Sequence, residues 1–509
     1  MKRLPAFYLG LLTGLNALSA IACTTIIAGS KATQDGSIII ARNSDSEGAC
    51  DPLNMMKHPA RTESYTFHSN SIENRHAHNH FNTTLPANST AYFAFPDWES
   101  LTMPQPSMEE IGSNDNNVAI TATESLQNSQ AVLQVDPYVT ETGITEDGIP
   151  SAILPQATSA RDGIRLLGGY IEKDGAGEGF GVAISDKKEA WYLETASGHH
   201  WLAQRIPDRA YFVSANQGRF KDVDFSDNKK VQSSGLLNFL ISNGLYDPAE
   251  PFNFFKICME NSLSDHSYNY PRVRRLLNLY SDIDHDDNDG LFPVFPVPSR
   301  KMTVASVAAG LRDHYQGTAH DAYQNRNPGD NWRPISVMRA SISHITSIRH
   351  WLPNDIATVV FIAQGMADLS AYVPIYHGLQ TTPQEYQGAT GEADDNSLFW
   401  QYRKLQALVM TDYPRFAPRV KKAIQTFEQT VARMQVELEK KYLEIYLQNR
   451  SLARGEIQAA TVDILQLQAK MLTSLIDEIA REAGLENLTT AGYQKLLTRI
   501  EHEYHFEKK

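Results

Sequence analysis

The sequence contains very little cysteine. Only Cys23, Cys50 and Cys258 occur among 509 residues, which excludes a small scaffold held together by disulfides. No second run of about 18 apolar residues follows the N-terminal one, so we expect no stable membrane insertion. The formal net charge is −13, so the Lys/Arg surplus that neutralises phosphates is missing and we expect no nucleic-acid partner. Hydrophobic residues make up 42% and charged residues 21% of the chain, a composition typical of globular proteins.

The N-terminus has the three parts of a secretory signal peptide. Two basic residues at positions 2 and 3 precede an apolar run over residues 4–18, and small residues, Ala20 and Ala22, stand before Cys23. The apolar run is shorter than the roughly 20 residues of a membrane span. We therefore predict that residues 1–22 are removed between Ala22 and Cys23, and that the mature protein is periplasmic or secreted.

Two other interpretations of Cys23 remain open from this segment alone. In the first, Cys23 is the lipid-modified residue of a lipoprotein. Such signals, however, usually carry Leu three residues before the cysteine, where this chain has Ala20. In the second, Cys23 is a buried apolar residue at the start of a strand and cleavage falls elsewhere.

The residues after Cys23 predict a β-hairpin. The β-branched run Thr24–Gly29 and the apolar run Ser37–Arg42 are joined by a turn at Gln34–Gly36 that ends in Asp-Gly. The second strand leads into Arg42 and Asp45, which this hairpin can return beside Cys23.

Strand-like and helical segments alternate irregularly along the rest of the chain. Strands are predicted at Thr90–Phe95, Val118–Thr123, Gly181–Ser185, Ala190–Glu194, Tyr211–Ser214, Ser336–Ile348 and Thr358–Ala363, and helices at Ala157–Lys173, Val231–Asn243 and Pro271–Tyr280. Because no regular βαβ repeat appears, we predict an α+β sandwich in which helices cover stacked sheets.

The character of the sequence changes at about Ser397. Long amphipathic helices rich in Glu, Lys, Gln and Leu are predicted at Phe416–Asn449 and Glu456–Ala483. We therefore divide the chain into a signal peptide (1–22), a main domain (23–396) and a helical C-terminal region (397–509). The helices are compatible with a homo-oligomer but do not require one, since no strict heptad persists.

An N-terminal cysteine has a chemistry that an internal cysteine lacks. Its thiol is a nucleophile, and its α-amine, with a reference pKa of about 7.7 to 8.0, can accept the thiol proton. Such a site also needs a cation near the sulfur, a carboxylate that holds the amine and donors for the oxyanion. Arg42 and Asp45 have the side chains for the first two roles, although a strand-end ion pair is an equally good interpretation of them.

Several blocks of the sequence resemble one family. Cys23-Thr24-Thr25 and Arg42-Asn43-x-Asp45 are followed by the blocks Asn114–Ser125, Asp136–Leu167, Glu189–Gln217 and Arg333–Pro353 in family order. Together they resemble the PepD-type cysteine dipeptidases of the N-terminal-nucleophile (Ntn) hydrolases over about residues 23–379.

This resemblance implies a four-layer αββα Ntn-hydrolase sandwich and an exported enzyme that hydrolyses dipeptides through a thioester. Cys23 would be nucleophile and base, Arg42 would polarise the thiol region, and Asp45 would orient the α-amine. Asn216 would contact the tetrahedral intermediate, and Arg339 is a candidate for a second arginine. No cofactor or metal is implied.

The sequence differs from the wider relatives of this family at the expected oxyanion site. Bile-salt and penicillin amidases carry an asparagine where this chain has Thr123-Glu124, so a backbone N–H is the alternative donor. Glu124 or Glu194 could hold the substrate ammonium, although a carboxylate paired with a neighbouring histidine or arginine is the preferred interpretation of Glu194.

Two other functions remain as alternatives. The first is an amidase of the bile-salt or penicillin acylase type, with a more apolar acyl pocket. The second is a lipid-anchored, non-enzymatic binding protein attached through Cys23.

Three features invite further interpretations. Cys50 and Cys258 could pair in an oxidising compartment, although a buried free thiol is as good an interpretation of Cys258. The acidic run Asp282–Gly290 lacks the glycine of an EF-hand loop and favours a solvated loop. Adjacent histidines at 199 and 200 would point to opposite faces of a strand, which argues against a metal site.

Overall fold

The computed structural model describes residues 23–69, 79–103, 105, 107–227, 229–282, 289–324 and 331–506. The predicted signal peptide lies outside these residues, as do the central residues of the acidic run. Among the residues described, no helix is both long enough and apolar enough to cross a membrane.

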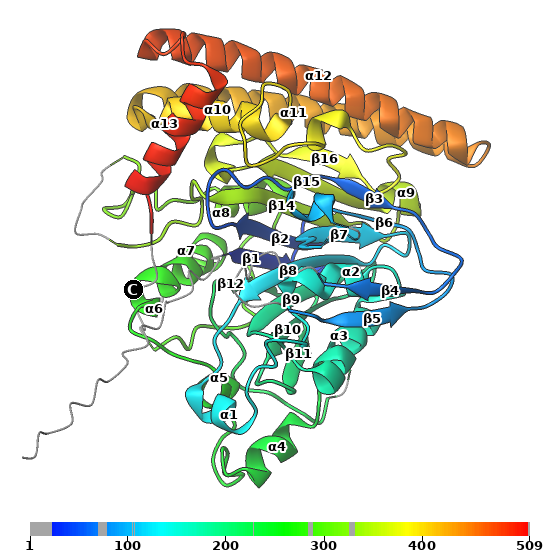
Figure 1. Ribbon diagram of the computed structural model, residues 1–509. Helices are drawn as coiled ribbons and strands as arrows, with labels where there is room; N and C mark the ends of the chain where they lie inside the picture. The colour runs from blue at the N-terminus through cyan, green and yellow to red at the C-terminus, as the bar shows by residue number, and fades with distance from the viewer. Residues whose placement is uncertain are drawn as a thin grey trace, which may run out of the picture.

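A six-stranded antiparallel sheet contains the start of the described chain (Figure 1). Its order is β12-β1-β2-β14-β15-β16. The strands are β1 (Thr24–Ala28), β2 (Ile38–Asp45), β12 (Tyr211–Ser214), β14 (Ala340–Ile348), β15 (Thr358–Gln364) and β16 (Val373–Tyr376). The first residues of the chain thus lie between strands from the middle and the C-terminal half of the sequence.

A second, eight-stranded antiparallel sheet has the order β13-β11-β10-β9-β8-β7-β6-β3. Its strands are β3 (Met56–His58), β6 (Tyr92–Ala94), β7 (Ile111–Asn114), β8 (Ala119–Ser125), β9 (Phe180–Ser185), β10 (Ala190–Thr195), β11 (Trp201–Arg205) and β13 (Val231–Ser233). A separate hairpin pairs β4 (Tyr65–His68) with β5 (Asn82–Leu85).

Thirteen α-helices and four short 3₁₀ turns occur in the described residues. The α-helices are α1 (Gln130–Val135), α2 (Ile149–Ile153), α3 (Ala160–Asp174), α4 (Leu236–Ser242), α5 (Phe254–Cys258), α6 (Asp265–Tyr268), α7 (Tyr270–Ser281), α8 (Val304–Leu311), α9 (Asn354–Ala357), α10 (Leu398–Met410), α11 (Tyr413–Tyr446), α12 (Arg450–Ala483) and α13 (Thr490–Glu503). The 3₁₀ turns are η1 (Ser100–Thr102), η2 (Glu146–Gly148), η3 (Ala367–Leu369) and η4 (Gln384–Tyr386).

Alternation of side chains along β1 and β2 divides the core into layers, because successive residues of a strand point to opposite faces. Ile27 and Ile40 pack in one cluster with Ala183 and Tyr192 of the second sheet, so the two sheets face each other. Ile26 on the other face packs with residues of α7 and α8. The far face of the second sheet is covered by α2 and α3.

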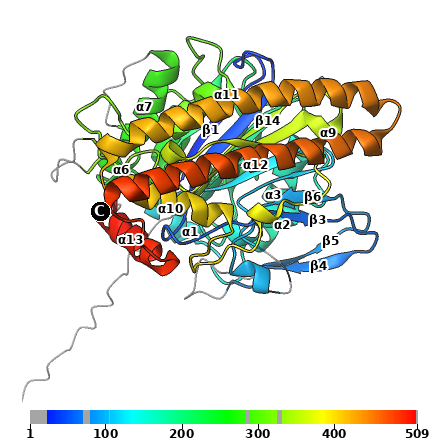
Figure 2. The same ribbon diagram turned by 90° about the horizontal axis from the view of Figure 1, so that it is seen from above.

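The C-terminal helices cover the β15–β16 side of the first sheet (Figures 1 and 2). Helices α11 and α12 run side by side along their length, and both predicted long helices are confirmed. Asn449 begins α12 by accepting the Leu452 N–H at 3.0 Å, and Gly484 ends it with φ at 68°. One hydrophobic cluster joins Ile375 of β16 to Leu472 of α12, so this region packs on the sheet that holds Cys23.

The predicted N-terminal hairpin is confirmed. Thr25 pairs with Arg42 in an antiparallel register. Gly36 in the turn has φ at 87°, a left-handed conformation that glycine adopts without strain, and Asp35 Oδ1 accepts the Ser37 N–H at 3.0 Å. Most other predicted elements occur within a few residues of the expected bounds, although β6 and β14 are shorter than predicted.

The helix predicted over Val231–Asn243 is wrong in its first half. Val231 to Ser233 instead extend the second sheet by pairing with β11. Gly235, with φ at 74°, turns the chain before α4 begins at Leu236. The β-branched Val231 and this glycine outweigh the helical periodicity.

The structure does not contain the disulfide considered between Cys50 and Cys258. None of the three cysteines, all of which are described, forms a disulfide. Cys258 is fully buried in the core between the two sheets, whereas Cys50 packs against the core under the C-terminal helices. The two thiols therefore belong to different cores, and burial raises the pKa of both.

Candidate active site

Cys23 lies directly before the first strand of the six-stranded sheet and is 1% exposed. The register pairs Thr24 with Asn43 and Thr25 with Arg42. Continuing it by one residue places Cys23 opposite Ser44, with Arg42 as its diagonal neighbour on the same face. The hairpin therefore brings Cys23 and Arg42 together, as predicted from the sequence.

Arg272 on α7 connects Cys23 to the neighbouring strand end. Its Nη1 donates to the Cys23 carbonyl oxygen at 2.5 Å and to Thr24 Oγ1 at 2.9 Å. Its Nη2 donates to Oδ1 of Asn216 at 3.0 Å and of Asn269 at 2.6 Å. One fully buried guanidinium thus holds Cys23 and Asn216 in a fixed relation.

Asn216 follows β12, the strand on the other side of β1, and is 4% exposed. Its backbone N–H donates to Asn269 Oδ1 at 3.1 Å, and Asn269 Nδ2 donates to the Asn216 carbonyl at 3.0 Å. Because its Oδ1 accepts from Arg272, its NH₂ group is the donor that is directed elsewhere. The next residue, Gln217, is 3% exposed, and both of its amide atoms lack a hydrogen-bond partner among the described residues.

Asp45 ends β2 and is 2% exposed. Its Oδ2 accepts a hydrogen bond from Nη2 of Arg333 and lies 3.8 Å from Nε of Arg339. Its Oδ1 is buried and has no hydrogen-bond partner in the described part of the chain. One oxygen of this carboxylate is thus fixed by an arginine, and the other is available to an amine.

Arg42 is fully buried and forms an ion pair with Glu110. Its Nη2 donates to Ser44 Oγ at 3.0 Å, and Ser44 Oγ donates to Glu110 Oε2 at 2.6 Å. Glu146 lies further away, at 3.9 Å from Nη1. These contacts lock the guanidinium on the face of the sheet to which Cys23 belongs.

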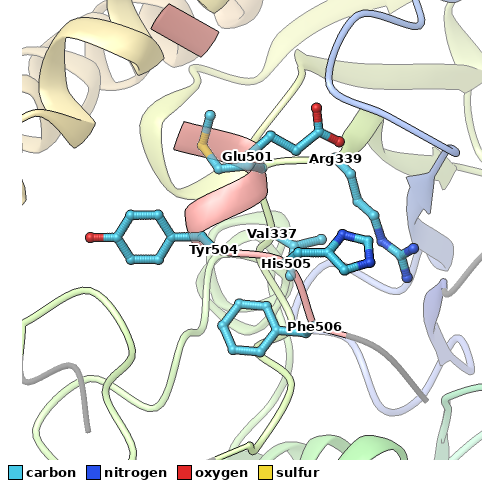
Figure 3. A pocket seen from close by; sticks show the side chains of 7 residues that line it. Val337, Arg339, Glu501, Tyr504, His505 and Phe506 are labelled. Carbon is cyan, nitrogen blue, oxygen red and sulfur yellow. The ribbon is translucent and has the colours of Figure 1, made fainter. Parts of the chain in front are cut away.

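Arg339 is the residue directly before β14. Its Nη2 donates to the Tyr268 hydroxyl at 2.7 Å, and its carbonyl accepts the Ser46 N–H at 3.1 Å. Figure 3 shows its side chain beside the end of α13, with the His505 ring turned toward it and Phe506 nearby. The structure therefore brings Arg339 to Asp45, but it shows no contact between Arg339 and Cys23 within the described residues.

The sequence suggested two carboxylates, Glu194 and Glu124, as groups that could bind the substrate ammonium, and the structure describes the side chain of only Glu194. Glu194 is fully buried and accepts the backbone N–H of Arg219 at 2.8 Å, with the Phe220 N–H at 3.4 Å. Burial raises its pKa to about 8. Glu194 is thus held by backbone donors of the loop after Asn216, and the prediction for the Glu124 side chain lies outside what is described.

The adjacent histidines do not lie on opposite faces of a strand, because β11 begins only at Trp201. His199 Nδ1 and His200 Nδ1 both bond to Asp136, at 2.8 and 3.0 Å. Neither takes part in a cluster of metal-ligating side chains within the described ranges. The pair closes the loop before β11 onto Asp136.

Two arginines of the site were not singled out from the sequence. Arg272 belongs to the helix predicted at Pro271–Tyr280, and Arg333 opens one of the blocks that carry the family resemblance. Burial, and then the charge of Arg339, lower the pKa of Arg333 well below its usual value, whereas a Cys23 thiolate opposes that shift. The charge on Cys23 therefore also affects the pKa of Arg333.

The fold and this site together define an α+β enzyme with a buried cysteine at the start of a central antiparallel strand. The chain belongs to peptidase family C69, whose family model matches residues 22–426. A protein of Salmonella dublin named probable dipeptidase is 46% identical over 398 residues, covering 77% of this chain and 89% of that protein.

More distant relatives carry similar names. A probable dipeptidase of Latilactobacillus sakei is 32% identical over 406 residues, covering 78% of this chain and 82% of that protein. A dipeptidase of Bifidobacterium longum is 33% identical over 422 residues, covering 76% and 77% of the two chains. These similarities confirm the family resemblance found in the sequence.

Proposed function

We propose that this protein is an exported cysteine dipeptidase that acts through an acyl-enzyme on Cys23. Dipeptidase activity accords with the family and with the names of its relatives. The observation that carries the mechanism is the position of Cys23. It is buried beside Arg272, next to the strand that ends in Asp45, whose Oδ1 has no partner among the described residues.

The layer arrangement supports the Ntn-hydrolase sandwich as the finer fold assignment. Two antiparallel sheets face each other across one core, and helices pack on the outer face of each sheet. In such a fold the catalytic residue begins a central strand, and Cys23 has that place. Cleavage after Ala22 would expose its α-amine in a periplasmic or extracellular compartment.

The reaction then needs only one residue as nucleophile and base. The Cys23 thiol attacks the carbonyl carbon of the peptide bond while its proton passes to the α-amine. The resulting ammonium protonates the leaving nitrogen as the C–N bond breaks, which leaves a thioester and a free amino acid. Water, deprotonated by the same α-amine, hydrolyses the thioester and releases the second amino acid.

The neighbouring side chains fit the remaining roles. Asp45 Oδ1 would accept a hydrogen bond from the α-amine and orient it. Arg42, locked by Glu110, would favour the thiolate from the face it shares with Cys23. The Asn216 NH₂ group would donate to the oxyanion, and Arg272 would position both residues. The geometry thus favours Arg272 over Arg339 as the second arginine next to the nucleophile.

The test compares Cys23→Ser and Cys23→Ala variants with the wild type in protein that begins at residue 23. We expect both variants to fold, with unchanged circular dichroism, and to lose dipeptide hydrolysis by about 10³-fold or more, because the thiol is the nucleophile. Iodoacetamide should inactivate the wild type with one label on Cys23.

Cys50→Ser is the matched control, because Cys50 is a half-buried thiol that packs against the core under the C-terminal helices. It should keep wild-type turnover and the same sensitivity to iodoacetamide. Dipeptide hydrolysis that persists in Cys23→Ala would contradict the mechanism.

A further inference from the structure

The chain beyond the part that matches the family returns to the active site. The family model ends at residue 426, within α11. Helices α12 and α13 follow, and the end of the described chain lies beside α6 in both views (Figures 1 and 2). Helix α6 carries Tyr268, whose hydroxyl accepts a hydrogen bond from Arg339.

The segment Tyr504–Phe506 passes beside Arg339, with the His505 ring next to its side chain and the Tyr504 ring turned away (Figure 3). Together with Glu501 and residues 337–338 it lines a small, partly open pocket of only about 10 Å³ against that side chain (Figure 3). Such a space holds one water molecule at most. The C-terminal segment therefore leaves little room on this side of Arg339 for a continuing peptide chain.

Arg339 retains hydrogen-bonding capacity on its other side. Its Nη2 is used by Tyr268 and its Nε lies 3.8 Å from Asp45 Oδ2, whereas Nη1 has no partner among the described residues although the side chain is only 9% exposed. Because Nη1 is not among the fully buried atoms that lack a partner, it can be reached by a ligand, and a carboxylate would pair with it.

The surroundings of Arg339 favour an anionic ligand. Arg272 and Arg333 are also buried, and their guanidinium carbons lie 5.2 and 5.5 Å from the centre of the Tyr268 ring. Three guanidinium groups thus gather around Tyr268, and two of them, those of Arg333 and Arg339, also lie at Asp45. The lowered pKa of Arg333, caused by burial and then by the charge of Arg339, agrees with a concentration of positive charge here.

The size of a dipeptide matches this arrangement. The carbon of its free α-carboxylate lies only three covalent bonds beyond the scissile carbonyl carbon, roughly 3 to 4 Å away. Arg339 lies within 3.8 Å of Asp45, the carboxylate that would hold the Cys23 amine. A carboxylate held by Arg339 would thus lie beside the group that orients Cys23, which suits a leaving group of a single residue.

We propose that Arg339 binds the free α-carboxylate of the substrate and that Tyr504–Phe506 wall off this subsite, so that the leaving group is a single amino acid. This proposal rests on the dipeptidase mechanism at Cys23. It assigns Arg339 to substrate recognition, and it gives the C-terminal helices a role in specificity.

The first experiment measures kcat/KM for a dipeptide and for the same dipeptide with a C-terminal amide, in mature wild type and in Arg339→Gln and Arg339→Lys. We expect the wild type to prefer the free carboxylate by about 10- to 100-fold, the worth of a charged hydrogen-bond pair. Arg339→Gln should abolish that preference mainly through KM, and Arg339→Lys should restore part of it.

The outcomes separate this proposal from the mechanism. No hydrolysis of any dipeptide by the wild type would contradict the proposed function itself. Hydrolysis of dipeptide and amide with equal kcat/KM by the wild type would overturn only the carboxylate subsite, even if the variants do not fold. A purely structural role of Arg339 is indicated if Arg339→Gln slows both substrates equally, and this also overturns it.

The second experiment uses a tripeptide of three different residues and identifies the first products by mass spectrometry. A chain that ends at Glu503 should cleave the first peptide bond, releasing a dipeptide, at least about tenfold faster than the wild type. A chain that ends at Phe506 and Arg499→Ala, an exposed position on α13, are the controls and should match the wild type. Unchanged products in the chain that ends at Glu503 would overturn the claim that Tyr504–Phe506 limit the leaving group to one amino acid.

Discussion

At the scale of single residues, Arg272 is the side chain on which the site depends most. Its guanidinium donates to oxygen atoms of Cys23, Thr24, Asn216 and Asn269. Burial makes each of these bonds costly to lose, because the acceptors have no water to replace the donor. The relative positions of the nucleophile and Asn216 therefore depend on the planar fork of an arginine.

Arg272→Lys tests this dependence. A lysine ammonium is a compact charge that cannot span the four acceptors, so we expect the free energy of unfolding to fall by about 2–5 kcal/mol and kcat to fall about 100-fold. Urea titration and dipeptide turnover measure the two effects. Arg275→Lys, on the same helix, is the control, because Arg275 is partly exposed and its ion pair with Asp313 can survive the change. Equal effects of the two substitutions would contradict the role of Arg272.

A pair of carboxylates gives the protein a pH-dependent stability. Asp97 and Asp51 are hydrogen-bonded to each other, and burial, followed by the charge of Asp51, raises the pKa of Asp97 from 3.8 to about 8. The folded state thus keeps a proton that the unfolded chain releases. The free energy of unfolding should therefore fall as the pH rises from about 4 to 8, by up to about 1.4 kcal/mol per pH unit.

Asp97→Asn should remove the part of this dependence that comes from Asp97, whereas Glu194, whose pKa is also raised by burial, keeps its own. The asparagine Oδ1 can still accept the Glu99 N–H, now at 2.8 Å from Asp97 Oδ1, and its NH₂ can donate to Asp51. Denaturant unfolding between pH 4.5 and 8 measures the slope in both proteins. Parallel profiles for wild type and variant would show that this pair does not hold the proton.

At the scale of elements, the sequence predicts best what is formed by neighbours in the chain. The hairpin of β1 and β2 follows from two apolar runs and an Asp-Gly turn, and it alone brings Arg42 beside Cys23. The long helices α11 and α12 follow from sustained periodicity. The strand β13 was missed because Val231 packs as a strand residue only after β11 is in place.

The packing of α12 predicts a sharp difference along one helix. Leu472 is fully buried in the cluster that the C-terminal helices share with the first sheet, whereas Val462 is 44% exposed. Leu472→Ala should lower the free energy of unfolding by about 2–5 kcal/mol, and Val462→Ala should change it by less than about 0.5 kcal/mol. Urea unfolding of both variants measures this, and a small effect of Leu472→Ala would show that α12 is not part of the cooperative core.

At the scale of the whole molecule, the limits of sequence reasoning follow from distance along the chain. Arg272 is 249 residues from Cys23, and Arg333 is 288 residues from Asp45. No local pattern connects such residues, since only the strand order β12-β1-β2-β14 and the placement of α7 bring them together. The contact of the C-terminal segment with Arg339 was hidden for the same reason.

The central claim is that Cys23 is the free N-terminal residue of the mature protein. The most direct test is an intact mass with N-terminal sequencing of protein purified from an exporting host without reductant. The mechanism predicts a chain that begins at unmodified Cys23, so that thiol and α-amine are both available. A lipid on Cys23, or cleavage at another residue, would contradict it, because Cys23 could not then act as its own base.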